Sequence, residues 1–127
     1  MEFVAHRVPP DRQEIQSYRP GGFTVSGIRF AGSLLLTAER VWPTPVTHIH
    51  EVELAHLAPL FDTATGTDLL IFGTGAVFVL PSAALLGELR RRGIAVESMA
   101  TAAACRTFNL LVSEERRVAA LLVALPG

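Results

Sequence analysis

The second half of the chain alternates between uninterrupted apolar runs and segments whose apolar residues recur at helical spacing. Runs without polar residues are typical of strands covered on both faces, whereas the helical segments begin at a capping residue and end at glycine or a charged residue. The expected elements are a strand at 69–72, a helix from Ser82 to about Arg92 stopped by Gly93, a strand at 94–98, a helix from Thr101 to about Glu114, and a strand at 118–125. This order predicts a β-α-β-α-β unit with right-handed parallel crossovers.

The first half of the chain has weaker periodicity. Residues 1–21 contain proline and glycine pairs and are expected to be irregular. Residues 23–30 are interpreted as a strand, and the apolar positions change sides at Gly27, which predicts a bulge or bend there. A turn at Ala31-Gly32 then leads into residues 33–37, which predicts an antiparallel β-hairpin.

Two further segments lie between the expected hairpin and the β-α-β-α-β unit. Trp42 is followed closely by Pro43 and Pro45, which favours an edge or connecting segment because proline cannot donate to a sheet ladder. Residues 51–61 carry apolar side chains at helical spacing and predict a short amphipathic helix. The 127 residues, half of them apolar, therefore predict an N-terminal segment 1–21 and a single three-layer α/β domain over 22–127, with a mixed central sheet.

The charge and the cysteine content indicate which partners and which cellular compartment to expect. The formal net charge is −1 and all eleven basic residues are arginine. The chain therefore lacks the excess of positive charge that is typical of nucleic-acid-binding proteins. Residues 69–87 carry no formal charge, but Gly73, Gly75 and Pro81 interrupt them, so no membrane span is expected. The single cysteine excludes an internal disulfide and suits a reducing compartment, and cytoplasmic residence is expected.

No metal site and no cofactor are expected from the sequence. His48 and His50 would project from the same side of an extended segment, with Glu51 and His56 nearby. A metal site needs three or four converging ligands, and the secondary structure between these residues works against convergence.

The predicted parallel strands place two loops at the same edge of the sheet. Gly73-Thr74-Gly75 follows one strand, and Thr101 begins the helix after the next. Ligands of open α/β sheets bind beyond the carboxyl ends of the strands, the glycines permit close backbone approach, and free N–H groups at a helix start favour an anion or a polarised carbonyl. This predicts a small cleft, although the same glycines can simply form a tight turn.

The helix from Thr101 contributes further candidate side chains. At 100° per residue, Cys105 lies on the apolar stripe, whereas Arg106 and Asn109 share the opposite side. Cys105 is therefore interpreted as a packing residue, with a reactive thiol as the alternative. Arg106 and Asn109 are candidates for an anion or amide contact, and Glu97 is the candidate base of an enzymatic alternative.

An ordered set of short motifs carries a family resemblance. The chain resembles the family that includes the mitochondrial respiratory complex I assembly factor three, the adipogenesis-associated domain proteins and many bacterial and archaeal proteins of unknown function. Each motif alone is weak, but their order and spacing over residues 22 to 123 are specific. The motifs are residues 22–27, Gly32-Ser33, Trp42, Gly73-Thr74-Gly75, residues 93–99, residues 104–109 and residues 116–120.

The resemblance implies a three-layer α/β fold with a mixed central sheet and brings no established catalytic mechanism. Ala100 and Phe108 stand where family sequences often carry an acidic residue and a tyrosine, so no mechanism is assigned to those positions. Two functions stay open. The favoured one is a non-catalytic protein-interaction or assembly-factor-like module with a protein partner. The alternative is a binding protein or enzyme for a small anionic or carbonyl-bearing metabolite, with its cleft at the Gly73 loop and Thr101.

Overall fold

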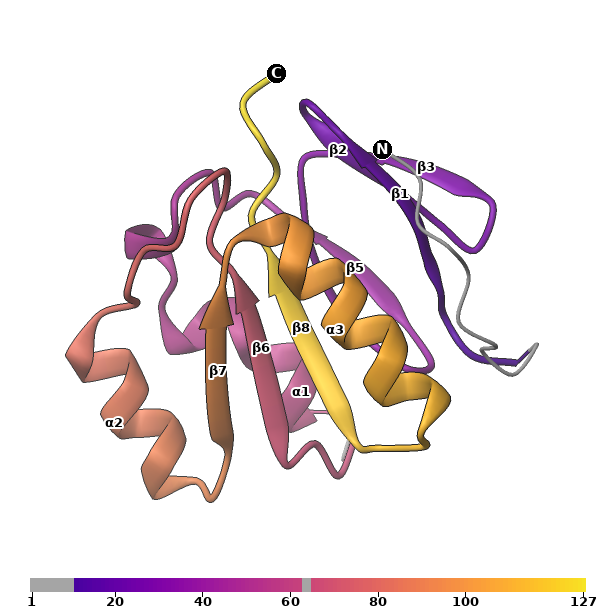
Figure 1. The fold of residues 1–127 in the computed structure, drawn as a ribbon. Helices are drawn as coiled ribbons and strands as arrows, with labels where there is room; N and C mark the ends of the chain where they lie inside the picture. The colour runs from indigo at the N-terminus through magenta and orange to yellow at the C-terminus, as the bar shows by residue number, and fades with distance from the viewer. Residues whose placement is uncertain (1–10, 63–64) are drawn as a thin grey trace.

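The computed structural model describes residues 11–62 and 65–127. Within these residues, eight strands form two sheets, and three α-helices pack around them (Figure 1). The elements are β1 (Ile15–Arg19), β2 (Gly22–Val25), β3 (Ile28–Ala31), β4 (Ser33–Thr37), β5 (Val41–Thr44), the 3₁₀ helices η1 (Ile49–Glu51) and η2 (Leu54–Leu57), α1 (Ala58–Asp62), β6 (Leu69–Gly73), α2 (Ala83–Arg91), β7 (Ala95–Met99), α3 (Thr101–Ser113) and β8 (Val118–Leu122).

The larger sheet is mixed, as the sequence predicts. Its five strands lie in the order β5-β4-β8-β6-β7. Strand β6 is parallel to both β7 and β8, and β4 is antiparallel to β8 and β5. The apolar runs of β6 and β8 occupy central positions, where both faces are covered by other layers. The proline-containing β5 is an edge strand, which confirms the interpretation of the segment around Trp42.

Two crossovers complete the predicted β-α-β-α-β unit. In α2, the Leu85 N–H donates to the Ser82 hydroxyl oxygen at 3.2 Å, and Gly93 follows the helix with a φ of +76°. Helix α3 differs in one detail. Ala100 occupies the N-cap position and Thr101 is the first helical residue, so Thr101 does not cap α3 as expected. The Thr101 hydroxyl instead forms hydrogen bonds with the loops at the edge of the sheet.

The two faces of the larger sheet carry separate hydrophobic cores. In Figure 1, α3 lies in front of this sheet and α1 behind it. The core behind the sheet joins β6 to η1, η2, α1 and α2 through residues such as Phe72, Leu57 and Leu89. The core in front joins the sheet to α3 and to the three-stranded sheet through residues such as Phe108 and Phe23. The molecule therefore has the three-layer α/β arrangement that the sequence predicts.

The predicted N-terminal hairpin is wrong in its pairing. Strand β2 pairs with β3, and the two-residue turn between them is Ser26-Gly27, with φ values of +49° and +84°. Positive φ at both central residues is typical of the turns that match strand twist, so Gly27 forms a turn and not a bulge. After Gly32, with a φ of +81°, the chain leaves this sheet and enters β4 of the larger one.

The segment predicted to be irregular, residues 1–21, contains a strand. Residues 1–10 lie outside the described residues, but Ile15–Arg19 forms β1 and pairs antiparallel with β2. The register shifts between Ile15 and Ser17, which marks a bulge. The sequence does not reveal this strand because Ile15 is its only fully buried residue and the bulge removes the alternation on which strand prediction depends.

The predicted helix over 51–61 is also corrected. The segment forms the short 3₁₀ helices η1 and η2, followed by one turn of α-helix, α1. Pro59 lies in the first turn of α1, where its missing N–H does no harm. In the interior of a longer helix its ring would clash with the carbonyl of the preceding turn, which disfavours a straight continuous helix through this position.

Candidate functional site

The Gly73 loop and the start of α3 meet at the same edge of the sheet, as predicted. Gly73 lies beside Met99 in the parallel register of β6 and β7. The Thr74 N–H donates to the Met99 carbonyl at 2.9 Å, and the Thr101 N–H donates to the Gly75 carbonyl at 2.9 Å. The Thr101 hydroxyl accepts the Gly75 N–H at 2.9 Å and donates to the Val123 carbonyl at 2.7 Å. This network ties together the carboxyl ends of β6, β7 and β8.

The network leaves no space for a ligand between these residues. Thr101 is fully buried and its hydroxyl both donates and accepts within the chain. A Cβ atom on Gly73 would lie 3.1 Å from the Thr101 Cα and 3.1 Å from the Ala104 Cβ. Glycine at position 73 thus permits close packing of α3 on β6, and the polar groups of the loop are bonded to one another.

Thr74 shapes the segment that follows the loop. Its hydroxyl donates to the Val77 carbonyl at 2.7 Å and accepts the Val79 N–H at 3.0 Å. The segment so folded carries Val77, Phe78 and Leu80 with 66%, 58% and 62% of their surface exposed. The other exposed large apolar side chains of the described residues, Ile28 and Leu110, lie in other elements. We call Val77, Phe78 and Leu80 the apolar loop.

A groove continues from the apolar loop along the edge of the larger sheet. It lies between α2 and β7 and has a volume of about 410 Å³. Strand β7 is an edge strand of the five-stranded sheet. The groove is lined by Phe78, Leu80, Leu86, Arg90, Ile94, Ala95, Val96 and Ser98. An exposed apolar surface thus lies beside the unpaired edge of β7.

Asn109, a predicted contact residue, has a structural partner instead. Its Oδ1 accepts the Ile15 N–H at 2.9 Å, and its Nδ2 donates to the Ile15 carbonyl at 2.8 Å. Asn109 is buried and holds β1, an edge strand of the three-stranded sheet, against α3. The sequence places Asn109 opposite the apolar stripe but cannot show that a strand covers that side.

Glu97 and Arg106 do not line the hollow beside the Gly73 loop. Glu97 is exposed on β7 and Arg106 is exposed on α3. A hollow of about 250 Å³ lies beside the loop, and neither residue lines it. Its walls come from residues 47–50, residues 74–79 and the segment after β8, and they include Ile49, Val77 and Val123. Strand register, close packing and hydrogen bonds bring together Gly73, Thr74, Gly75 and Thr101 from the predicted site.

Cys105 is a packing residue in this structure. It is fully buried in the core between α3 and the sheet, next to Phe108 and Ala104. Burial raises the pKa of the Cys105 thiol to about 12, and the nearby charge of Arg106 offsets this only in part. The thiolate is the nucleophilic form of cysteine, so a protonated thiol without solvent access cannot act as a nucleophile.

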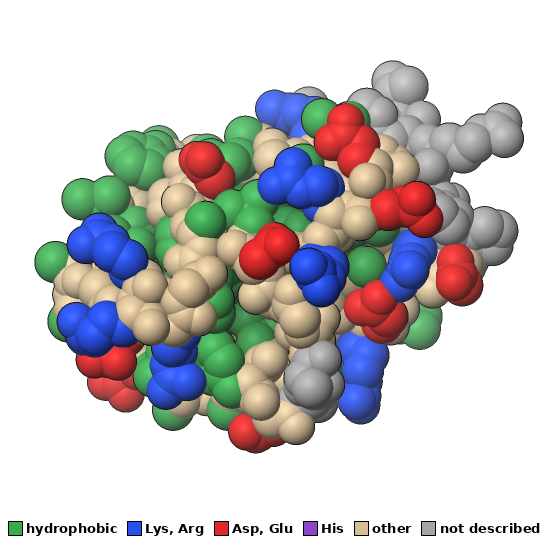
Figure 2. All heavy atoms as spheres, turned by 90° about the horizontal axis from the view of Figure 1, so that it is seen from below, with side chains coloured by type: hydrophobic (Ala, Val, Ile, Leu, Met, Phe, Trp, Pro, Cys, Tyr) green, Lys and Arg blue, Asp and Glu red, His purple; other side chains and the backbone are tan. Residues whose placement is uncertain are grey.

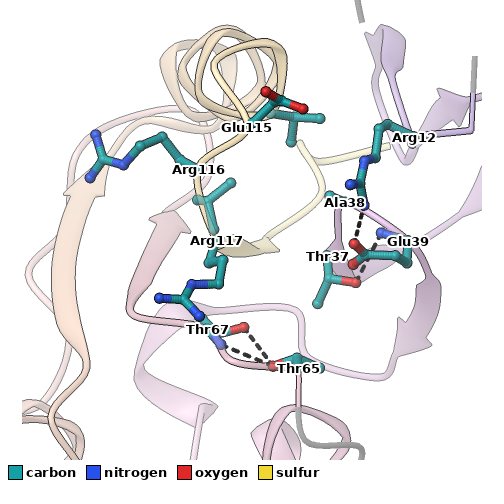
Figure 3. A pocket seen from close by; sticks show the side chains of 11 residues that line it. Arg12, Thr37, Ala38, Glu39, Thr65, Thr67, Glu115, Arg116 and Arg117 are labelled. Carbon is teal, nitrogen blue, oxygen red and sulfur yellow. Dashed lines mark hydrogen bonds and ion pairs between the residues drawn. The ribbon is translucent and has the colours of Figure 1, made fainter. Parts of the chain in front are cut away.

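A second, polar hollow lies at the opposite end of the larger sheet, where β6 and β8 begin (Figure 3). Its volume is about 70 Å³. Figure 3 shows Arg12 reaching toward Glu39, with which it forms an ion pair, and Thr65 bonded to Thr67. Arg117 lies 4.0 Å from the Asp68 carboxylate. Two of the arginines that line this hollow, Arg12 and Arg117, thus each face an acidic side chain of the same chain.

Among residues 11–62 and 65–127, no three His, Cys, Asp or Glu side chains are grouped so that they could hold a metal ion. The Glu51 carboxylate accepts the Thr47 hydroxyl and the N–H groups of Thr47 and His48, and these bonds lower its pKa. No helix in the same residues is both long and apolar enough to span a bilayer.

The apolar loop is the feature that sequence reasoning misses. The sequence pattern gives residues 76–81 no role. Position outside a strand or helix does not by itself predict exposure, because Val46, Val52 and Val123 also lie outside these elements and are buried.

Comparison with known proteins places this fold in a family. Residues 15–123 match the family model described as "Protein of unknown function (DUF498/DUF598)". The chain belongs to this family. It is 38% identical to an uncharacterised protein of Rhodobacter capsulatus over 113 residues, which is 89% of this chain and 86% of the relative.

A relative with an assembly role and a solved structure are also similar. The chain is 35% identical to the NADH dehydrogenase [ubiquinone] 1 alpha subcomplex assembly factor 3 of Danio rerio, and the match covers 89% of this chain and 65% of the factor. The chain thus spans about two thirds of that protein's length. The crystal structure of an outer membrane protein from Bartonella henselae superimposes with a TM-score of 0.82 and 29% identity, covering 91% of this chain and 98% of that one.

Proposed function

We propose that this protein is a non-catalytic interaction module that binds a partner protein, in the manner of an assembly factor. The observation that carries the proposal is the apolar loop, in which Val77, Phe78 and Leu80 are each more than half exposed beside the groove along β7. Water contact with three adjacent large apolar side chains is unfavourable, and clusters of this kind mark interaction sites. The name of the Danio rerio relative supports the assembly role.

The backbone of the apolar loop is ordered by hydrogen bonds, as expected of a preformed binding surface. The Thr74 hydroxyl bonds to both the Val77 carbonyl and the Val79 N–H, so the apolar side chains project from an ordered backbone. An ordered surface loses less conformational entropy on binding than a flexible one. Phe78 supplies the aromatic anchor that protein interfaces favour.

The small-molecule alternative has less support. It requires polar groups near the Gly73 loop that are available to an anion or a carbonyl. The Thr101 hydroxyl and the N–H groups of Thr74, Gly75 and Thr101 already bond within the chain, and Glu97, Arg106 and Asn109 lie elsewhere. A second function is therefore not proposed.

Affinity capture from native extract tests the proposal. The bait is the wild-type chain, and the test variant carries Phe78→Ser together with Leu80→Ser, which removes two of the three exposed apolar side chains without touching the core. Ile28→Ser is the matched control, because Ile28 is 60% exposed but lies in β3. We expect a stoichiometric partner that the control retains and the test variant loses. Co-purification of a metabolite without any captured protein would contradict the proposal.

The proposed location is the cytoplasm, a reducing compartment that a single free cysteine suits. Cell fractionation checks this point directly. It is informative because a Francisella tularensis relative, 28% identical over 110 residues, is named a 13 kDa major membrane protein.

A further inference from the structure

The outer edge of β7 presents backbone groups that the larger sheet does not use. The Ala95 N–H donates to the Asp68 carbonyl at 3.0 Å, and the Met99 carbonyl accepts the Thr74 N–H at 2.9 Å. Both residues thus point their backbone groups toward β6. Because these groups alternate along a strand, the N–H and carbonyl groups of Val96 and Ser98 point toward the free edge.

The same two residues form a wall of the groove. Val96 and Ser98 line it from β7, and Leu86 lines it from α2. The apolar loop contributes Phe78 and Leu80 to this groove. A segment placed along β7 would therefore find main-chain hydrogen-bonding groups and an apolar surface together, which is the combination that strand addition uses.

The opposite end of the groove is basic. Arg90 lines it near the carboxyl end of α2, and basic side chains gather at the α2 end of the lower face, on the left of Figure 2. Arg91 is paired with Glu88, and the Arg92 guanidinium lies over the Phe61 ring. Among the ion pairs of the described residues, none includes Arg90. Its charge favours an acidic side chain at this end.

We propose that the occupant of the groove is an extended segment of a partner protein that adds as a sixth strand beside β7. Its main chain bonds to Val96 and Ser98, its apolar side chains enter the groove at every second position, and a carboxylate side chain lies by Arg90. The inference rests on the proposed function and names the chemistry of the partner.

A second copy of this chain suits the edge less well. In an antiparallel dimer, the outward N–H and carbonyl groups of Val96 and Ser98 are used together when Val96 of one copy pairs with Ser98 of the other. That register places the two Glu97 side chains directly opposite each other, and like charges in this position destabilise a sheet. A partner segment with its own sequence avoids this repulsion.

Selection of binding peptides tests the occupant directly. A displayed library of short random peptides is panned against the full chain, and one selected peptide is resynthesised with each amide N-methylated in turn. We expect selected peptides to alternate apolar residues and to carry Asp or Glu. N-methylation should weaken binding about tenfold at every second position only, because alternate amides face β7.

Two measurements on the protein accompany the peptide series. Hydrogen exchange should slow at the Val96 and Ser98 amides when the peptide binds. Arg90→Gln should weaken binding about two- to fivefold, whereas Arg91→Gln, in which the lost charge is already paired, should leave affinity unchanged. Ser98→Pro removes an outward N–H and should prevent binding, and the peptide series tests the same bond if this variant does not fold.

Several results would overturn the inference. These are failure to select any peptide, an N-methylation profile without a period of two, binding that leaves Val96 and Ser98 unprotected, or a dimer of the free chain that protects them. If Ser98→Pro and Arg90→Gln retain a captured partner that the Phe78 and Leu80 substitutions lose, strand addition is wrong and the interaction module stands. If neither a partner nor a peptide binds, both proposals fail.

Discussion

Replacing Asn109 with alanine should weaken the junction between α3 and β1. The wild-type side chain accepts the Ile15 N–H at 2.9 Å and donates to the Ile15 carbonyl at 2.8 Å. Asn109 and Ile15 are 3% and 1% exposed, so water cannot replace these bonds without rearrangement. Each buried backbone group left unpaired costs about 1–3 kcal/mol. Loss of both should therefore lower the free energy of unfolding by about 2–6 kcal/mol, a large share of the roughly 5–15 kcal/mol typical of a domain.

Asn109→Asp tests the same two hydrogen bonds by introducing a side chain that can ionise. In its protonated form, the carboxyl introduced by this substitution can still donate to the Ile15 carbonyl and accept the Ile15 N–H. The carboxylate form loses the donor and is buried, so the pKa of this group in the folded variant should rise above the unfolded value of about 3.9. The stabilising contribution is then present below about pH 4 and is lost as pH rises through the raised folded pKa. The variant should be less destabilised at about pH 4 than at about pH 7.

Urea denaturation at both pH values measures these effects, and hydrogen exchange at Ile15 reports the junction locally. Ser113→Ala is the matched control on α3. Its exposed hydroxyl donates to the Leu110 carbonyl at 2.6 Å, so its loss should change stability by less than about 0.5 kcal/mol. The reasoning is refuted if Asn109→Ala is as stable as this control, or if Asn109→Asp is equally destabilised at both pH values.

Three further predictions concern packing. Gly73→Ala should cost about 1–3 kcal/mol in urea denaturation, because its Cβ would lie 3.1 Å from the Thr101 backbone. Gly87→Ala should instead stabilise α2 by about 0.5–1 kcal/mol, since only the flexible Arg91 side chain lies near the new Cβ. Native Cys105 should resist iodoacetamide and react on unfolding. Its pKa rises from 9.0 to about 12 on folding, so its contribution to stability is full below pH 9 and is lost toward pH 12, and Cys105→Ala should show a flatter alkaline profile.

The sequence alone determined the elements whose signals are local. The apolar runs of β6 and β8, the cap and stop of α2, and the order of the β-α-β-α-β unit follow from periodicity and from residues within a few positions of each element. The shared edge of the Gly73 loop and Thr101 follows as well, because parallel strands place their carboxyl ends together. The buried position of Cys105 follows from the helical angle.

Only the tertiary structure decided what covers each surface. The sequence presents Asn109 as a contact residue because its partner Ile15 is 94 residues away and lies in a strand without a clear pattern. It assigns Phe78 no role because exposure depends on the elements around a loop, and these are not encoded in its neighbours. Periodicity reports which side of an element is apolar. Packing between distant segments decides whether a polar side is bonded, as at Asn109, and whether an apolar one is left open, as in the apolar loop.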